Sequence, residues 1–354
     1  MIPLRIPCSR PYDVLVGDGL LDRADELLHT AVPRARRALV VTDSNVAALH
    51  LPRTLASLRA AGLDAGEFVF PAGESSKNER TLFDILGACA AAGLTRTDVV
   101  VALGGGVVGD IAGLAASLWL RGIAVVQIPT TLLAAVDSSV GGKTAIDIDA
   151  GKNLVGAFHQ PSLVLCDPAL LATLPAEVFA DGCAEVIKYA FIGAAELRAF
   201  LEAHDVRDDL ERVIALSVAR KRDAVAADER DTGERQLLNL GHTIGHAIEM
   251  ASGFGVSHGR AVAIGMVAAA EGAAACGYAA ENAAPAMRAM LRRAGLPVRT
   301  DFAPETLLPF IAHDKKRAGD RLTFVLPVRP GESELKALDA DEVRELVTRG
   351  VEAL

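Results

Sequence analysis

The architecture of this chain is predicted best from one segment, Asp98-Val99-Val100-Val101-Ala102-Leu103-Gly104-Gly105-Gly106-Val107-Val108-Gly109. Its apolar residues predict a buried strand, which three glycines end before a helix expected over residues 111–120. The glycines satisfy the pattern G-x-G-x-x-G, in which the backbone approaches a pyrophosphate and N–H groups at the helix start bind its charge. The segment therefore predicts a dinucleotide site, unless the glycines only make a tight strand–helix turn.

One feature of a standard dinucleotide fold is missing after this segment. The next predicted strand, residues 123–128, is followed by Pro129 and supplies no carboxylate to bind a ribose. Asp43 follows an earlier predicted strand, residues 38–42, and is the candidate for that contact.

Strand-like and helical segments alternate through the first half of the chain. Strands that are apolar along their whole length are typical of a parallel sheet covered by helices on both faces. From about residue 176 to 312 the chain is alanine-rich with helical spacing, and a strand-like pair near 322–326 and 335 precedes a last helix. These patterns predict a Rossmann-like α/β domain over residues 1–174 and a mostly α-helical domain over residues 175–354.

Composition excludes several classes of protein. The chain has 354 residues and a formal net charge of -9, which argues against a nucleic-acid-binding surface. Its five scattered cysteines include no C-x-x-C pair and predict reduced thiols in the cytoplasm. The amino-terminal residues lead directly into strand-like sequence and predict no secretory leader. The most apolar stretch, residues 111–120, is too short to span a bilayer, so no membrane partner is expected.

Three histidines lie close together near the middle of the second domain: His242, His246 and His258, out of only eight in the chain. Neutral imidazole is the commonest metal ligand, and the first two share one face if the segment is helical. Glu185, in an apolar helical segment, could complete a zinc site with two of the three, but spacing does not choose between His246 and His258. Hydrogen-bonded core histidines are the alternative. Glu185 and Lys188 also share a helix face, where a surface ion pair is the alternative.

Basic side chains near glycines suggest an anion pocket in this acidic chain. Lys143 and Lys152 lie in the glycine-rich segments 137–144 and 151–153, and two lysines near glycine amides suit a phosphate monoester. Solvated surface lysines are the alternative. Further candidates for the same pocket are Lys221, Arg235, Asn239 and the basic run 313–317.

Six motifs together resemble the 3-dehydroquinate synthases, members of the sugar-phosphate cyclases. They lie, in order, at residues 104–110, 129–133, 137–144, 151–153, 184–188 and 239–246, and the resemblance runs from about Tyr12 to Leu326. It implies that the α/β domain binds NAD, that the helical domain binds metal and substrate, and that the protein is a homodimer.

The resemblance also assigns residues. It gives the metal, Zn²⁺ or possibly Co²⁺, to Glu185, His242 and His258, with His246 beside the ligands or handling protons. It gives NAD to Asp43, Asn45, Gly73, Glu74, Lys77, Gly105, Gly106, Val107, Val108, Gly109, Asp110, Thr130, Thr131, Lys143, Lys152, Leu170 and Thr173. It gives the substrate to Asp137, Lys143, Asn153, Lys188, Lys221, Arg235, Asn239 and one of Lys315 and Lys316, with Arg121 reaching the phosphate from the neighbouring subunit.

The implied reaction converts 3-deoxy-D-arabino-heptulosonate 7-phosphate, a small phosphorylated sugar acid, to 3-dehydroquinate and phosphate. It proceeds by transient NAD-dependent oxidation, phosphate elimination, re-reduction and intramolecular aldol closure. Arg260 departs from the family pattern, because many members carry an acidic residue there. Three alternatives remain: a sibling cyclase acting on an amino analogue or on sedoheptulose 7-phosphate, a metal-dependent polyol dehydrogenase, and a catalytically silent NAD-binding protein.

Overall fold

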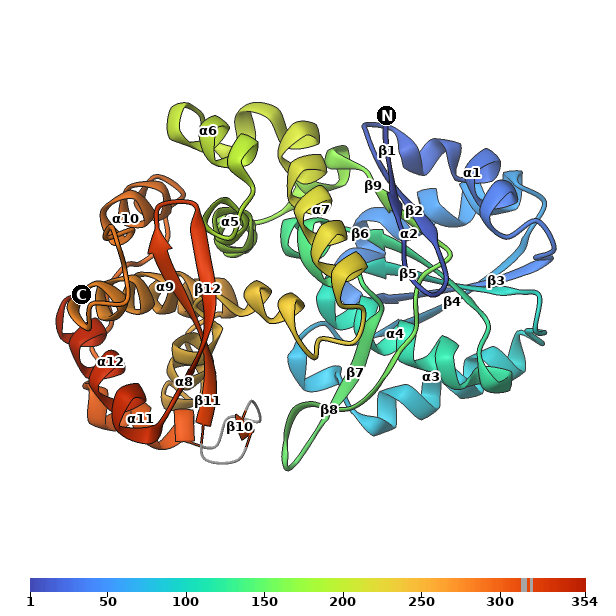
Figure 1. The fold of residues 1–354 in the computed structure, drawn as a ribbon. Helices are drawn as coiled ribbons and strands as arrows, with labels where there is room; N and C mark the ends of the chain where they lie inside the picture. The colour runs from blue at the N-terminus through green and yellow to red at the C-terminus, as the bar shows by residue number, and fades with distance from the viewer. Residues whose placement is uncertain (313–316, 319–320) are drawn as a thin grey trace. The chain divides into compact units, whose positions relative to one another are not determined.

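The computed structural model describes residues 1–312, 317–318 and 321–354 (Figure 1). They form two compact units, one of Met1–Pro175 with Lys221–Glu229 and one of Ala176–Arg220 with Arg230–Leu354. Residues 221–229 thus belong to the first unit, although the chain enters the second unit at Ala176. The division expected from the sequence, 1–174 and 175–354, does not include this return to the first unit. Residues 221–227 continue the helix α7 (Leu210–Ala227) without any break in the sequence pattern, so nothing local marks the change of unit.

The first unit is built on a seven-stranded sheet. The strand order is β1 (Ile2–Ile6), β2 (Tyr12–Val16), β9 (Leu163–Cys166), β6 (Ala124–Pro129), β5 (Val99–Gly104), β3 (Arg37–Asp43) and β4 (Asp64–Phe70). β1 pairs antiparallel with β2, and the other neighbouring strands are parallel. The predicted Rossmann-like α/β fold with a parallel sheet is confirmed.

Helices cover both faces of this sheet (Figure 1). α1 (Ala24–Ala31) and α2 (Ser44–Ala60) lie on one face, and α3 (Glu79–Ala91) and α4 (Gly106–Leu118) lie on the other. Along β3, Ala38 and Val40 pack into the core with the first pair of helices, whereas Leu39 and Val41 pack with the second pair. This follows because successive side chains of a strand point to opposite faces, and it explains why four consecutive residues of the strand, 38–41, are apolar.

The strand order reverses at β3. From β3 the chain moves outward to the edge strand β4, returns to the other side of β3 at β5, and continues through β6 to β9. Ligands of doubly wound sheets bind outside the carboxyl ends of the strands at such a reversal. Asp43 ends β3 and Gly104 ends β5, so the topology brings the two cofactor segments suggested by the sequence to the same edge.

Asp98 ties β3 to β5 at their amino-terminal ends. Its carboxylate accepts hydrogen bonds from the backbone N–H groups of Arg36 (2.9 Å), Arg37 (2.8 Å) and Thr95 (2.7 Å) and from the Thr95 hydroxyl (2.7 Å). Burial by itself raises the pKa of this carboxyl, but the four hydrogen bonds outweigh burial and hold the pKa below its usual range.

A hairpin and short helices complete the first unit. β7 (Lys143–Ile148) and β8 (Gly151–Phe158) pair antiparallel, although the sequence suggested only polar, glycine-rich segments there. Glycine and charged residues are poor strand formers, so β-propensity did not reveal the hairpin. The short helices are η1 (Leu20–Arg23), η2 (Glu74–Ser76), η3 (Trp119–Arg121), η4 (Ala134–Ser138, a π-helix) and η5 (Pro168–Thr173).

The second unit is mostly helical, as predicted. Its helices are α5 (Ala176–Phe191), α6 (Ala195–Ala203), η6 (Val206–Asp209), the start of α7, η7 (Glu234–Asn239), α8 (His242–Ala251), α9 (His258–Ala275), α10 (Ala284–Arg293), α11 (Pro304–Ala312) and α12 (Ala340–Glu352). A small antiparallel sheet contains β10 (Arg317–Ala318), β11 (Arg321–Arg329) and β12 (Glu332–Leu338).

Glycines allow α8 and α9 to pack in direct backbone contact. A Cβ atom at Gly265 would lie 2.1 Å from the Gly241 carbonyl oxygen, and one at Gly245 would lie 3.1 Å from the Ala261 carbonyl oxygen. Any larger residue at position 265 therefore has to push the two helices apart. Among all the described helices, none combines the length and the apolar character needed to cross a membrane.

Candidate functional site

Three side chains of the second unit converge on one point. Glu185 lies in the middle of α5, and His242 and His258 are the first residues of α8 and α9. Glu185 Oε1 lies 3.6 Å from His242 Nε2 and 3.3 Å from His258 Nε2. One ligand atom from each residue lies within 4.8 Å of the other two. The sequence left the choice between His246 and His258 open, and in the structure it is His258 that faces Glu185.

The Glu185 carboxylate fits a divalent metal. It is 1% exposed, and its Oε2 accepts a hydrogen bond from Lys188, which is also buried. No described residue donates a hydrogen bond to Oε1, the oxygen that faces the two imidazoles. An unsatisfied buried oxygen is costly, and one carboxylate oxygen with two imidazole nitrogens is a ligand set typical of Zn²⁺ with an open position.

The electrostatics of His258 agree with this assignment. Burial alone would lower the pKa of the imidazole, but the neighbouring Glu185 and Glu249 carboxylates raise the pKa to about 10. The two carboxylates therefore favour a positive charge at this position, which a metal cation supplies when it replaces the proton.

His246 lies beside the three converging residues. Its side chain is exposed, and its ring centroid lies 5.5 Å from that of His242 and 5.9 Å from that of His258. It belongs to a second group that could hold a metal, with Glu249 and His258. Glu249 has no role in the sequence-based prediction, although it ends the histidine-rich segment two helical turns after His242.

The cofactor segments meet at the carboxyl edge of the parallel sheet. Gly106 begins α4, and no side chain caps that helix, so its first N–H groups are available to an anion. A Cβ atom at Gly105 would lie 3.0 Å from Thr131 Cγ2, which follows β6 at the same edge. Asp43 caps α2, since its Oδ1 accepts hydrogen bonds from Asn45 N (2.9 Å) and Val46 N (3.0 Å).

Two of the glycines have a packing role as well. A Cβ atom at Gly104 would lie 2.5 Å from the Val108 side chain, and one at Gly109 would lie 2.8 Å from Gln127 Oε1. Close packing at the start of α4 therefore requires Gly104 whether or not a cofactor is bound, whereas a larger residue at position 109 would displace the end of the Gln127 side chain. The tight-turn interpretation and the dinucleotide interpretation of this segment are compatible.

Lys77 is the centre of a polar cluster in the first unit. Its ammonium lies 2.6 Å from Asp110 Oδ2 and donates a hydrogen bond of 2.5 Å to Asn153 Oδ1. Burial alone would lower the pKa of Lys77, but the Asp110 carboxylate and other acidic groups raise it. Asn153 has a φ of 56° and belongs to β8, so the hairpin brings it to residues far away in sequence. Lys152 lies 3.8 Å from Glu74 Oε1.

Lys221 lies in the part of α7 that belongs to the first unit. It is 5% exposed, and its ammonium donates hydrogen bonds to the Asp137 carbonyl oxygen at 2.6 Å and to the Asp137 carboxylate. These two residues, 84 apart in the sequence, are thus a partly buried ion pair.

The remaining predicted residues are spread over both units, and two of them lie outside the described residues. In the first unit, Lys143 at the start of β7 and Arg121 in η3 have exposed side chains. Gly73 precedes η2, and Thr130 follows β6. Leu170 and Thr173 lie in η5, where Thr173 Oγ1 is 3.1 Å from His50 Nε2. In the second unit, Arg235 is buried and Asn239 half-buried in η7. Lys315 and Lys316 lie outside the described residues.

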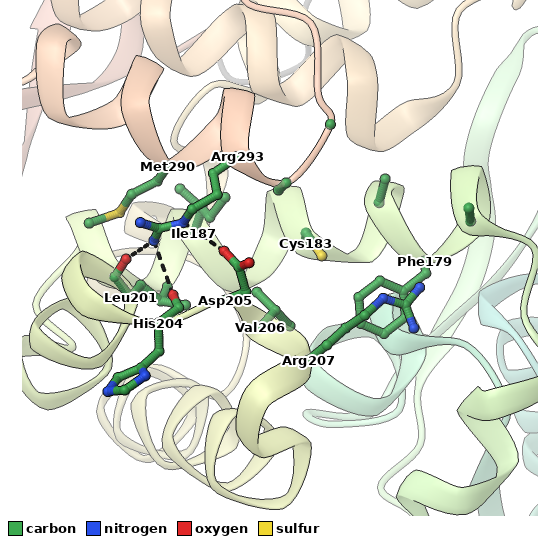
Figure 2. Close-up of a pocket in the computed structure, with 14 residues that line it drawn as sticks. Phe179, Cys183, Ile187, Leu201, His204, Asp205, Val206, Arg207, Met290 and Arg293 are labelled. Carbon is green, nitrogen blue, oxygen red and sulfur yellow. Dashed lines mark hydrogen bonds and ion pairs between the residues drawn. The ribbon is translucent and has the colours of Figure 1, made fainter.

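A cavity of about 290 Å³ in the second unit contains none of the predicted site residues (Figure 2). Cys183 and Ile187 line it from α5, on a different side of that helix from Glu185. Its polar groups bond mainly to one another, since Arg293 binds Asp205 at 2.7 Å and donates hydrogen bonds to the carbonyl oxygens of Leu201 and His204. The candidate site is therefore the metal cluster and not this cavity.

Comparison with known proteins identifies the family. A model of the 3-dehydroquinate synthase N-terminal region matches residues 67–181, and one of the 3-dehydroquinate synthase C-terminal region matches residues 182–317. This chain belongs to the 3-dehydroquinate synthase family. The resemblance seen in the six motifs is thereby confirmed.

Individual relatives agree with the family match. The 3-dehydroquinate synthase of Symbiobacterium thermophilum is 45% identical over 97% of this chain and 98% of its own. A 2-epi-5-epi-valiolone synthase from Streptomyces hygroscopicus subsp. jinggangensis 5008, solved with NAD⁺ and Zn²⁺, has a TM-score of 0.86 and 31% identity over 97% of each chain. A 2-deoxy-scyllo-inosose synthase complexed with carbaglucose-6-phosphate, NAD⁺ and Co²⁺ has a TM-score of 0.85 and 26% identity, covering 98% of this chain and 99% of its own.

Proposed function

We propose that this chain is an NAD- and Zn²⁺-dependent 3-dehydroquinate synthase that converts 3-deoxy-D-arabino-heptulosonate 7-phosphate to 3-dehydroquinate and phosphate. The observation that carries the proposal is the buried Glu185 oxygen aimed at the Nε2 atoms of His242 and His258. The full-length relative named 3-dehydroquinate synthase supports the same assignment.

Glu185, His242 and His258 would hold the metal. When bound, Zn²⁺ or Co²⁺ acts as a Lewis acid that increases the acidity of a coordinated substrate hydroxyl. Lys188 donates a hydrogen bond to the other Glu185 oxygen, so it orients the carboxylate and places a positive charge beside the substrate oxygens. His246, exposed and adjacent to two of the ligands, is suited to accept and return a proton.

The carboxyl edge of the parallel sheet would hold NAD. Bound there, NAD would supply a reversible two-electron acceptor for a substrate hydroxyl, so that the overall reaction would involve no net oxidation. The uncapped start of α4 at Gly106 provides N–H groups and a helix dipole for the pyrophosphate. The buried Lys77 pairs with Asp110 of this helix, which fixes the position of both residues.

Basic and amide side chains would bind the phosphorylated sugar acid. We assign this role to Lys143, Asn153, Lys188, Arg235 and Asn239, because cations bind phosphate and carboxylate oxygens well in a chain that otherwise repels anions. Lys221 holds Asp137 through both its carbonyl and carboxylate oxygens, so its role is to position that residue.

We also propose that the enzyme is a homodimer in which Arg121 reaches the neighbouring active site. Leu120 and Arg121 have φ values of 49° and 68°, a left-handed conformation that costs non-glycine residues roughly 1–3 kcal/mol each. Strained backbone at an exposed position supports a functional role for the arginine, here contact with the neighbouring subunit. Leu118, 51% exposed, and Leu120, 36% exposed, provide apolar surface for the contact. The five unpaired thiols support a reducing compartment, the cytoplasm.

The test is phosphate release from 3-deoxy-D-arabino-heptulosonate 7-phosphate with catalytic NAD⁺ and Zn²⁺, while absorbance of NADH is followed. We expect stoichiometric phosphate without accumulating NADH and loss of activity in His258→Ala. The matched control is His204→Ala, which should remain active, because His204 is an exposed histidine of the same unit that belongs to neither group of potential metal ligands.

Two results would contradict the proposal. Net accumulation of NADH would indicate a polyol dehydrogenase. Phosphate release only from sedoheptulose 7-phosphate would indicate a sibling cyclase, a candidate that the likeness to the 2-epi-5-epi-valiolone synthase supports.

A further inference from the structure

We propose that Glu249 is a positioning residue for the metal centre, which holds the His258 ring through Nδ1 so that Nε2 points at Glu185 and His242. The inference rests on the metal site of the proposed function and assigns a role to a residue outside the ligand set. Glu249 is 6% exposed in α8, so it is a buried carboxylate that the three ligands leave unexplained.

The two nitrogens of His258 face two different carboxylates. Nδ1 lies 3.2 Å from Glu249 Oε2, and Nε2 lies 3.3 Å from Glu185 Oε1. On the Nε2 side, Glu185 belongs to the metal group, so with metal bound Nε2 has to carry the lone pair. The proton of the neutral imidazole then belongs on Nδ1, where the ionised Glu249 carboxylate can only accept a hydrogen bond. The lone pair is then on Nε2, which is the nitrogen directed at the metal position.

The other histidine ligand is held in a different way. His242 Nδ1 lies 3.1 Å from the carbonyl oxygen of Leu240, only two residues earlier in the chain. The backbone therefore selects the tautomer of His242, and no substitution of a side chain can remove that acceptor. His258 depends on a side chain from a different helix, which makes its orientation separately testable.

The backbone at His258 is anchored without Glu249. The hydroxyl of Ser257 donates a hydrogen bond of 2.7 Å to Asp181, and Gly259 lies so close to α5 that a Cβ atom there would be 2.3 Å from the Asp181 carbonyl oxygen. Removing the Glu249 carboxylate should therefore free rotation of the imidazole ring while leaving the start of α9 in place.

A competing role for Glu249 is that of a direct ligand. Glu249, His246 and His258 form the second group whose ligand atoms lie within 4.8 Å of one another. The two roles exclude each other at His258, because Nδ1 either donates a proton to Glu249 or binds a metal with it. Hydrogen-bond distance to Glu249 and exposure of His246 favour the positioning role.

The experiment compares Glu249→Gln, which keeps the shape and one acceptor oxygen, with Glu249→Leu, which keeps neither charge nor acceptor. The matched control is Glu271→Gln, at a partly buried glutamate that lies on α9 with His258 and binds Arg288 at 2.8 Å. Zn²⁺ affinity is measured by competition with a chelator, metal content by atomic absorption, and ligand geometry by the visible spectrum of the Co²⁺ form.

We expect Zn²⁺ affinity to fall about 10-fold in Glu249→Gln and about 100-fold in Glu249→Leu, with an altered Co²⁺ spectrum. Glu271→Gln should match the unsubstituted protein in both. Unchanged affinity and spectrum in the two Glu249 variants would overturn the proposal. So would two Zn²⁺ ions per unsubstituted chain and one in Glu249→Gln, because Glu249 would then be a ligand. If the leucine variant does not fold, the isosteric glutamine variant decides.

Failure of this inference is distinguishable from failure of the proposed function. If the unsubstituted chain binds Zn²⁺ and His258→Ala abolishes binding while both Glu249 variants retain it, only the role of Glu249 is wrong. If the unsubstituted chain does not bind Zn²⁺, the metal site itself is wrong.

Discussion

Substitution of Gly265 by alanine should weaken both the second unit and its metal site. The added Cβ atom would lie 2.1 Å from the Gly241 carbonyl oxygen and 2.8 Å from the Gly245 nitrogen, both backbone atoms of α8 or its start. A carbon–oxygen contact needs about 3.3 Å, so α8 and α9 have to separate by roughly 1 Å. Overpacking of this kind costs up to about 3 kcal/mol, and the better helix propensity of alanine returns about 1 kcal/mol.

The net expectation is a loss of about 2 kcal/mol in the free energy of unfolding of the second unit, a fall of roughly 4–8 °C in its thermal midpoint. The same separation moves His242 away from His258, because each begins one of the two helices. Metal sites tolerate displacements of only about 0.2 Å in ligand distance, so Zn²⁺ affinity should fall as well.

The assays are calorimetric unfolding of the metal-free protein and Zn²⁺ competition with a chelator. Gly87→Ala is the matched control, since Gly87 lies inside α3 with nothing within 4 Å of the added Cβ atom. That substitution should stabilise the protein by roughly 0.5–1 kcal/mol. Unfolding and Zn²⁺ affinity of Gly265→Ala equal to those of the unsubstituted protein would refute the reasoning that backbone contact between α8 and α9 sets the ligand spacing.

Three further predictions concern pH, thiols and metal. Asp98→Asn should lower the free energy of unfolding by about 2 kcal/mol at pH 7 in urea titrations. Because the folded pKa of Asp98 is lowered, its contribution to the free energy of unfolding is complete above pH 3.8 and is lost as pH falls through the folded pKa. Between pH 5 and pH 3 the free energy of unfolding should therefore fall less in Asp98→Asn than in the unsubstituted protein. Burial raises the pKa of Cys89 to about 11 and that of Cys183 to about 12, so a thiol reagent at pH 8 should modify Cys8 and Cys276 while the buried thiols stay unreacted until denaturant is added. Dialysis against a chelator should abolish phosphate release, and Zn²⁺ or Co²⁺ should restore it, whereas Mg²⁺, which prefers oxygen ligands, should not.

Local patterns were sufficient for much of the fold. The apolar runs predicted as strands, which are β3, β5 and β6 in the structure, are buried on both faces of the sheet, so their residue composition alone was enough to predict them. The hairpin β7–β8 was not predicted, because its glycines and charges resemble a loop. The return of residues 221–229 to the first unit was not predicted either, because α7 continues there without a change of pattern.

The candidate site, like the fold, was predicted from the sequence only in part. Residue type and spacing identified histidines, a buried carboxylate and a glycine-rich helix start as the chemical groups, and a family resemblance carried by six motifs named their roles. Spacing could not choose between His246 and His258, and it gave no role to Glu249, since three-dimensional neighbours on different helices leave no periodic signal. Those choices depend on how closely α8 packs on α9 and on where α5 presents Glu185. Hydrophobic periodicity is a property of one segment and can be predicted from it, whereas the meeting of side chains from three helices is decided only when the whole core packs.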